Sequence, residues 1–188
     1  GDYASGEATL SPLNDGEVVA DSYASGALFH GPAFQLMTKL ERSPAGAQGT
    51  MKASSTEIPN RLLNPALLDA STHVIPHDAL QMWSEDIAYE LVAYPYRINR
   101  LELFGPTPAD GEATVSAQFT GFADEGRMPQ FTVEISHAGA IWCRYQLTEI
   151  LMPKGPIGMA KAVDRRRFLR DRQPVPGLGL SRFEGKQT

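Results

Sequence analysis

Residues 64–78 read NPALLDASTHVIPHD, and this stretch decides the fold because it combines a complete helix signature with an acid and a histidine. Asn64 is a favourable N-cap, and Pro65 suits the first helical position, where its missing N–H is not needed. Pro76 predicts the end of the helix, since the residue before a proline is pushed out of helical conformation. The stretch therefore predicts a helix of about three turns, over about residues 64–75.

The helix carries Asp69 and His73 at positions i and i+4, so their side chains share one face. Three interpretations are open for the acid. It is exposed and has no role, it makes a local structural contact with His73, or it lines a pocket in which burial raises its pKa so that it can deliver a proton. The spacing alone does not separate these interpretations.

Most of the chain after this helix has the alternation of half-buried strands. The four expected strands are residues 94–105, 111–122, 130–139 and 140–152. The last two are expected to form a hairpin about 137–139, and an earlier hairpin is expected to turn at SPAG, residues 43–46. One helix followed by several antiparallel strands predicts an α+β fold, with a curved sheet packed on the helix.

The composition of the 188 residues, 42% hydrophobic and 21% charged, indicates one globular domain with a substantial core. We expect a loose lead-in over 1–20, a folded domain over 21–153 and a basic tail over 154–188. No apolar run is long enough to cross a bilayer, so no membrane association is expected. The single cysteine, Cys143, excludes a disulfide framework and favours a reducing cytoplasm. No glycine-rich nucleotide-binding motif occurs.

Charge is distributed unevenly along the chain. Residues 154–188 hold nine Lys or Arg and three Asp or Glu, whereas residues 1–153 hold eight and nineteen. The basic run DRRRFLRDR, residues 164–172, is either a solvated surface or linker, a docking site for an acidic protein, or a nucleic-acid contact. Nucleic acid is not expected, because the run lacks interleaved aromatic residues and any zinc-ligand spacing.

Three segments in a fixed order carry a resemblance to a known family: FHGPAFQ (29–35), NPALLDASTH (64–73) and YPYRINRLELFG (94–105). Over roughly residues 20–152 the chain resembles the second half of the dehydratase domains of modular polyketide synthases. The tail is similar to dehydratase-like domains of iterative enediyne and polyunsaturated fatty acid synthases. The resemblance implies one half of a double hot dog, in which an antiparallel sheet wraps around a central helix.

The resemblance also implies roles for particular residues. Asp69 would be the acid that helps a β-hydroxyl depart as water, and His73 would orient the acid or the hydroxyl. The substrate-binding residues would be His30, Gly31, Pro32, Phe34 and Leu68. The substrate would be a β-hydroxyacyl thioester on an acyl carrier protein, among other synthase domains.

The chain departs from the family pattern where the family's base should be. It contains no His-x-x-x-Gly-x-x-x-x-Pro segment, His30 replaces a tyrosine, and Asn64 replaces a histidine. His30 or His73 could substitute as the base. His77 is expected to be a loop residue, and His137 a solvated residue of a hairpin turn.

Three functions follow from this pattern: a dehydratase that needs a base from elsewhere, a non-catalytic acyl-binding or structural module, and a homodimeric hot-dog thioesterase. An isolated hot-dog half would leave a sheet edge uncovered, so we expect a homodimer. No metal site is predicted, because Asp69 and His73 are too few ligands for zinc. No cofactor is predicted either, since phosphopantetheine would arrive attached to the carrier-bound substrate.

Overall fold

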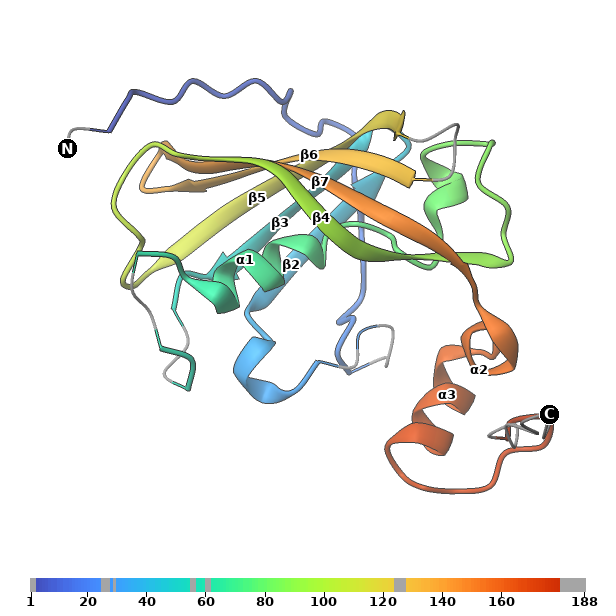
Figure 1. Ribbon diagram of the computed structural model, residues 1–188. Coiled ribbons are helices and arrows are strands. Elements are labelled where there is room, and N and C mark those ends of the chain that lie inside the picture. The colour runs from blue at the N-terminus through green and yellow to red at the C-terminus, as the bar shows by residue number, and fades with distance from the viewer. Residues whose placement is uncertain are drawn as a thin grey trace, which may run out of the picture.

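The computed structural model describes residues 3–24, 28, 30–54, 57–59, 62–123 and 128–179 (Figure 1). The strands are β1 (Glu17–Val18), β2 (Met37–Ser43), β3 (Gly46–Lys52), β4 (Leu91–Leu103), β5 (Glu112–Ala123), β6 (Met128–His137) and β7 (Ala140–Pro153). The helices are α1 (Pro65–Thr72), α2 (Gly155–Met159) and α3 (Ala162–Leu169), with short 3₁₀ turns η1 (Pro32–Phe34) and η2 (Leu80–Met82).

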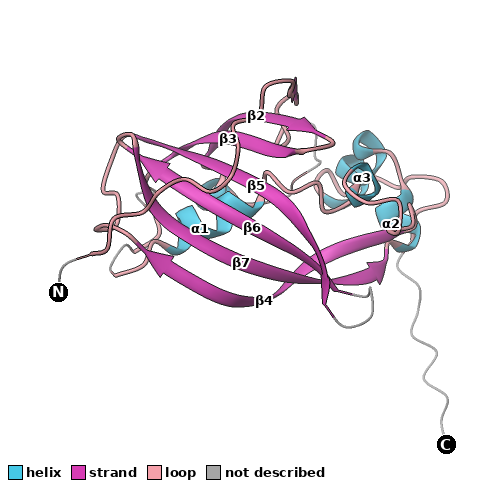
Figure 2. Ribbon diagram, turned by 90° about the horizontal axis from the view of Figure 1, so that it is seen from above, coloured by secondary structure: helices cyan, strands magenta, loops and turns pink. Residues whose placement is uncertain are grey.

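All seven strands form one antiparallel sheet in the order β1-β2-β3-β5-β6-β7-β4. The sheet curves over α1, which lies along its inner face, while α2 and α3 lie beyond the end of β7 (Figures 1 and 2). The later strands agree with the ranges expected from sequence to within about three residues, as boundary uncertainty allows. One helix held by one curved sheet is the predicted α+β arrangement.

The start of α1 is fixed by Asn64. Its side-chain oxygen accepts a hydrogen bond from the N–H of Leu67 at 3.0 Å, as predicted for an N-cap. Its side-chain nitrogen donates to the carbonyl of Ala53 at 2.8 Å. The cap therefore also ties the helix to the segment that follows β3.

The helix ends at Thr72, three residues earlier than expected, with His73 as its C-cap. The carbonyls after this point do not need donors from a further helical turn, because Arg42 of β2 donates to three of them. Its guanidinium reaches the carbonyls of Val74 at 2.9 Å, His73 at 3.1 Å and Ile75 at 3.3 Å. A single side chain thus satisfies acceptors that the end of a helix leaves free.

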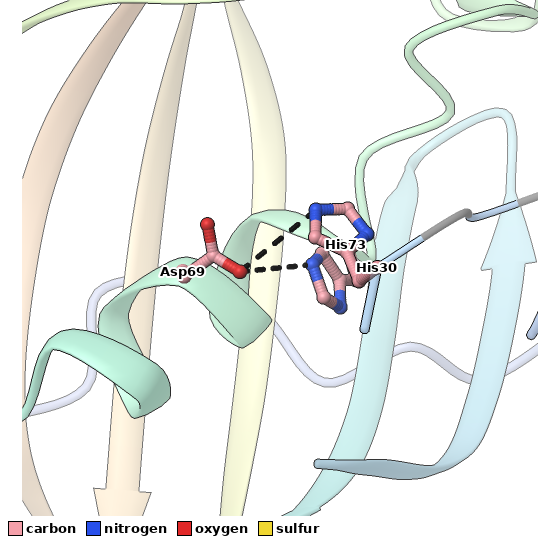
Figure 3. Close-up of side chains that lie close together, drawn as sticks. All are labelled: His30, Asp69 and His73. Atoms are coloured by element: carbon pink, nitrogen blue, oxygen red, sulfur yellow. Dashed lines mark ion pairs between the residues drawn. The ribbon is translucent and has the colours of Figure 1, made fainter. Parts of the chain in front are cut away.

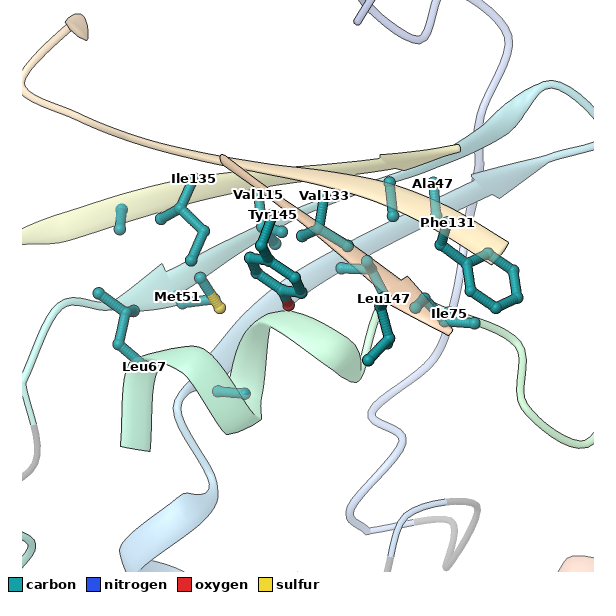
Figure 4. Packing of buried hydrophobic residues seen from close by; sticks show 14 of the residues in the cluster. Ala47, Met51, Leu67, Ile75, Val115, Phe131, Val133, Ile135, Tyr145 and Leu147 are labelled. Atoms are coloured by element: carbon teal, nitrogen blue, oxygen red, sulfur yellow. The ribbon is translucent and has the colours of Figure 1, made fainter. Parts of the chain in front are cut away.

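The hydrophobic core lies between α1 and the inner face of the sheet (Figure 4). Ala66 and Ala70 are fully buried and small, so the helix approaches the strands closely. The hydroxyl of Ser71 contacts the hydroxyl of Tyr145 at 2.6 Å, which satisfies two buried polar groups. Much of the remaining buried volume comes from strand residues, among them Met51, Val115, Phe131, Val133, Ile135 and Leu147.

The two hairpins predicted from sequence are present. β2 and β3 turn at residues 44–45, within the expected SPAG segment. β6 and β7 turn at Ala138 and Gly139, whose φ angles of 50° and 80° are those that a tight two-residue turn requires.

The two edges of the sheet differ in length. β1 has two residues, whereas β4 has thirteen and pairs only with β7 along its length. Pro95 lies within β4, where an edge strand tolerates a missing N–H. Tyr94, Tyr96 and Ile98 of this edge are 53%, 60% and 45% exposed, so β4 presents an open, apolar border.

The segments that flank the sheet are attached to it. The backbone N–H of Thr9 donates to the Glu134 carboxylate at 3.0 Å, and Arg144 donates to the same carboxylate at 2.6 Å. Part of the expected lead-in therefore lies on the outer face of the sheet. Of the tail, residues 180–188 lie outside the described part of the chain. Among the described residues, no helix has the length and apolarity that crossing a bilayer requires.

Candidate active site

Asp69 lies on α1 at the open side of the helix, with 40% of its side chain exposed. It borders two pockets. One has a volume of about 530 Å³ and extends toward α2 and α3, and the other, of about 340 Å³, runs between α1 and β4. The carboxylate is therefore neither free on the outer surface nor sealed in the core, and it can meet a ligand.

His73 follows one turn later and is 1% exposed. Its Nε2 lies 3.3 Å from Oδ2 of Asp69, and its Nδ1 lies 2.8 Å from the hydroxyl of Tyr23. That hydroxyl oxygen accepts the N–H of Met37 at 3.2 Å, so its own proton is available for Nδ1. Burial raises the pKa of Tyr23 to about 12, which keeps this proton on the phenol. With Nδ1 accepting the proton of the phenol, the ring hydrogen of His73 is on Nε2, which faces Asp69.

His30 approaches the same carboxylate from the segment before η1 (Figure 3). Its Nε2 lies 3.8 Å from Oδ2 of Asp69, and its ring centroid lies 4.0 Å from that of His73. Burial, and then the neighbouring His73 ring, lower the pKa of His30, although Asp69 opposes them. The imidazole is therefore neutral at pH 7 and able to accept a proton.

Three buried polar atoms converge in this cluster. Within the described part of the chain, Nδ1 of His30, Oδ2 of Asp69 and Nε2 of His73 make no hydrogen bond. Buried polar atoms are normally hydrogen-bonded, so such a group marks a place where the atoms of a ligand belong.

The pocket of about 530 Å³ provides the space for that ligand. His30 and Asp69 both line it, and apolar residues of β4, α2 and α3 form much of the remaining wall. The apolar lining includes Ile75, Val92, Tyr94, Ile157 and Leu169. A mostly apolar pocket with a few convergent polar groups suits an acyl chain with a polar reacting end.

The other expected substrate-binding residues are spread more widely. Gly31 and Pro32 line a third pocket, of about 680 Å³, which shares His30 with the first. Leu68 lines the smaller pocket beside β4. Phe34 packs against the hydrophobic core. The structure thus brings His30, Asp69 and His73 together and distributes the other four residues around them.

His77 lies in a turn between α1 and η2, as expected, but its contacts were not foreseen. Its Nδ1 lies 3.0 Å from Oε2 of Glu149, which is fully buried, and its Nε2 lies 2.9 Å from the carbonyl of Thr72. Burial would lower the pKa of His77, but the charge and hydrogen bond of Glu149 outweigh it and raise this pKa. The sequence signal for this contact lay in β7. Tyr145 and Leu147 are alternate residues of the strand that face the core, and Glu149 is the next residue in the same row.

Two other groups outside the cluster bear on the chemistry. Burial raises the pKa of the Cys143 thiol to about 12, so this cysteine is not a nucleophile. His137 is partly exposed at its hairpin, with Nε2 3.0 Å from the carbonyl of Asp110. Neither group reaches the cluster of His30, Asp69 and His73.

The comparison with protein families finds one match. Residues 4–145 match the model of the polyketide synthase dehydratase N-terminal domain. The matching model is that of the N-terminal domain of the dehydratase, whereas the motifs had indicated the second half. No curated protein sequence matches the chain.

Solved structures agree with the family match. A variant of the GphF DH1 dehydratase is 22% identical with a TM-score of 0.56, and covers 82% of this chain and 54% of that one. The dehydratase-cyclase domain of ambruticin biosynthesis is 20% identical with a TM-score of 0.55, covering 80% and 53%. The dehydratase domain of RzxB from Pseudomonas fluorescens is 18% identical with a TM-score of 0.56, covering 80% and 54%.

These likenesses confirm the predicted hot-dog fold, and the chain spans about half the length of the dehydratases that it matches. The family model covers most of the chain, from before β1 to the first part of β7, and includes the cluster around Asp69. This chain belongs to the polyketide synthase dehydratase N-terminal domain family.

Proposed function

We propose that this chain removes water from β-hydroxyacyl thioesters, with Asp69 and His30 as the two proton-transfer groups. The observation that supports this most directly is the 3.8 Å distance between Nε2 of His30 and Oδ2 of Asp69, at the wall of a mostly apolar pocket of about 530 Å³. Elimination of water needs a base near one carbon and an acid near the oxygen on the next carbon. Two groups this close can serve adjacent atoms of one substrate.

In the proposed reaction, neutral His30 takes the proton from the α-carbon. The electron pair of that C–H bond forms the double bond, and the C–O bond at the β-carbon breaks. Asp69 in its protonated form gives its proton to the departing oxygen, which leaves as water. His30 then passes its proton to Asp69, which restores the protonated acid and the neutral imidazole. Each such proton-transfer group typically contributes about 10²–10⁴-fold to the rate.

His73 has a positioning role in this proposal. Its ring is buried and fixed by Tyr23, so its Nε2–H faces Asp69 at 3.3 Å. A group held in this way orients the carboxylate while the more exposed His30 remains free to reach the substrate.

We propose that the substrate arrives on an acyl carrier protein, with phosphopantetheine as part of the substrate and no other cofactor. The pocket that shares His30 is also lined by Arg166 of α3 and by Arg170, the residue that caps its C-terminus. Cationic side chains at a pocket entrance favour an acidic partner through electrostatic attraction. Other synthase domains are further partners in this proposal, and the cytoplasm is the expected compartment.

The motif of α1 supports assignment to the acid-bearing half of a double hot dog, the second half in the synthases that the sequence resembles. The exposed edge formed by β4 supports a homodimer, in which a second copy covers Tyr94, Tyr96 and Ile98. Light scattering at micromolar concentration should give the mass of two chains. A monomeric mass would count against the dimer.

A non-catalytic acyl-binding module is the second candidate. The sequence observation that favours it is the missing His-x-x-x-Gly-x-x-x-x-Pro segment. A module of this kind would bind the acyl thioester without converting it. A hot-dog thioesterase, the third possibility, would release the free acid instead of water.

Incubation with a β-hydroxyacyl pantetheine thioester distinguishes these functions, with mass spectrometry of the products in the presence of EDTA. We expect loss of water with the native chain and a decrease of at least about 10²-fold with Asp69→Asn. Asp86→Asn, in an exposed loop, is the matched control and should keep full activity. Equal, negligible turnover in the native chain and Asp69→Asn would refute the dehydratase proposal, and free acid as the product would favour the thioesterase.

A further inference from the structure

We propose that His30, Asp69 and His73 form a binding site for one divalent transition-metal ion, with Zn²⁺ as the best fit. The sequence offered Asp69 and His73 alone, which are too few ligands for zinc. The fold adds His30, which lies thirty-nine positions before Asp69 in the chain. This inference does not depend on the proposed dehydration.

The distances between the candidate ligand atoms match a metal site. One atom from each residue lies within 4.8 Å of the other two. Oδ2 of Asp69 is 3.3 Å from Nε2 of His73 and 3.8 Å from Nε2 of His30. In a tetrahedral zinc site with bonds of about 2.0–2.1 Å, neighbouring ligand atoms lie about 3.3 Å apart. Of the three pairs, one already has this separation, a second needs a movement of about half an ångström, and the two histidine nitrogens lie within 4.8 Å of each other.

Two of the three atoms that face the centre of the cluster have no hydrogen-bond partner among the described residues. Nε2 of His73 and Oδ2 of Asp69 make no hydrogen bond to any described residue, and the His73 side chain is 1% exposed. A buried ring nitrogen aimed at a carboxylate and a second imidazole is costly unless something occupies the space between them. A cation placed there satisfies all three groups at once.

The surroundings hold the ligands as the outer shell of a metal site does. The hydroxyl of Tyr23 lies 2.8 Å from Nδ1 of His73, and can accept its N–H when Nε2 binds the metal. The carbonyl of His30 accepts a hydrogen bond from the side-chain nitrogen of Gln35 at 2.8 Å, which restrains the backbone that carries this ligand. Both contacts orient a ligand without occupying its metal-facing atom.

Three ligands leave one position of a tetrahedral ion open. Asp69 and His30 also line the pocket of about 530 Å³, so a water molecule or an oxygen of a small ligand can reach the fourth position. Two imidazoles and a carboxylate favour Zn²⁺, Co²⁺ or Ni²⁺ over Mg²⁺ and Ca²⁺, which prefer oxygen ligands. Since the metal would occupy the atoms assigned to proton transfer, Zn²⁺ should inhibit dehydration.

The direct test is titration of the EDTA-treated, dialysed full chain with Zn²⁺ by calorimetry and with Co²⁺ by visible spectroscopy. We expect one ion per chain and Co²⁺ absorption bands typical of nitrogen and oxygen ligands at low coordination number. His30→Gln and Asp69→Asn should each weaken Zn²⁺ binding at least about 100-fold, since outer-shell changes alone cost 10–100-fold. His137→Gln and Asp86→Asn are the matched controls and should bind as the native chain does.

Circular dichroism and thermal unfolding without metal establish that each variant is folded. Zn²⁺ should raise the melting temperature of the native chain and of both controls, but not that of His30→Gln or Asp69→Asn. Absence of stoichiometric Zn²⁺ binding at millimolar concentration would overturn the proposal. Binding that survives both site substitutions, or that is lost equally in His137→Gln, would also overturn it. Turnover in EDTA is measured separately, so failure of the metal site and failure of the dehydratase remain distinct outcomes.

Discussion

Two acid–histidine pairs lie near the end of α1, and they differ in how completely their polar atoms are used. In the cluster of His30, Asp69 and His73, Oδ2 of Asp69 and Nε2 of His73 make no hydrogen bond to the described residues, and Asp69 borders two pockets. In the pair of His77 and Glu149, both ring nitrogens of the histidine face acceptors at 2.9–3.0 Å. The same residue types thus build an open cluster and, a few residues away, a pair that is closed at both ring nitrogens of its histidine, although Oε1 of Glu149 makes no hydrogen bond to the described residues.

The proton states of the two regions differ for the same reason. A ring that faces a carboxylate and a carbonyl needs an N–H on each nitrogen, so His77 is held as the imidazolium and its pKa is raised. His30 has no comparable acceptor, and burial with the adjacent His73 lowers its pKa. An acid–histidine pair is therefore a candidate for chemistry when the ring nitrogen that faces the acid makes no hydrogen bond, and for stability when both ring nitrogens are hydrogen-bonded.

Exchanging either histidine for glutamine should have the largest effect and should separate the two regions. His30→Gln removes the proposed base, so turnover of a β-hydroxyacyl thioester should fall about 10²–10⁴-fold while the melting temperature changes little. His77 also lines the pocket of about 530 Å³, but both its ring nitrogens contact the protein. His77→Gln should therefore lower the melting temperature and reduce the turnover of the folded fraction much less than His30→Gln does. The measurements are initial rates and thermal unfolding on both variants, and the distinction fails if His77→Gln costs more activity than His30→Gln.

Loss of the buried acid should have the next largest effect. Glu149→Leu leaves the His77 imidazolium without its partner, and breaking a buried pair costs about 3–5 kcal/mol in the free energy of unfolding. Asp69→Asn should cost much less, because its carboxylate is 40% exposed. Urea denaturation of both variants gives these values. Comparable losses would show that the cluster is as structural as the pair.

The closed pair should also make stability depend on pH. Because the folded pKa of His77 is raised, its contribution is complete below the unfolded value of about 6.5 and is lost as the pH rises through the folded pKa. The free energy of unfolding in EDTA should therefore decline over this range in the native chain. His77→Gln should reduce that slope, whereas His30→Gln should retain it, and an unchanged slope in His77→Gln would contradict the assignment.

The smallest effect is expected from removing the Tyr23 hydroxyl, which holds His73 in the open cluster. Tyr23→Phe removes the hydroxyl between Nδ1 of His73 and the N–H of Met37, which should cost about 1–3 kcal/mol in the free energy of unfolding. Tyr23→Phe should also weaken Zn²⁺ binding about 10–100-fold. Tyr3→Phe, at an exposed tyrosine, is the control for both measurements. A native Zn²⁺ affinity in Tyr23→Phe would show that the phenol does not orient His73.

The sequence was sufficient for much of the fold because its signals are local. Asn64, Pro65 and Pro76 mark the helix, and alternating apolar residues mark β5, β6 and β7. The pair at positions 69 and 73 followed from helical spacing in the same way. Contacts between distant segments left no comparable trace, so His30 could be suggested as a base but not placed beside Asp69.

The lack of a local signal for long-range contacts also explains why the sequence did not predict the contacts of the closed pair and of the tail. His77 meets an acid seventy-two residues away, and only the inward row of β7 hinted that this acid needed a partner. No pattern in residues 164–172 indicated that Arg165 would line the pocket shared by His30 and Asp69. Both placements follow from how the sheet and the tail pack.

Arg42 connects the β2–β3 hairpin to the segment that carries His73, so the position of the hairpin affects the geometry of the candidate site. Its guanidinium holds the carbonyls on either side of Val74, so the position of the adjacent His73 is set by which residue of β2 faces inward. Displacing the hairpin by one residue would turn the arginine to the outer face and release the end of the helix. The alignment of β2 within the sheet thus sets the distance between the His73 imidazole and the Asp69 carboxylate. Substitutions in the hairpin could change that distance during evolution while both groups are kept.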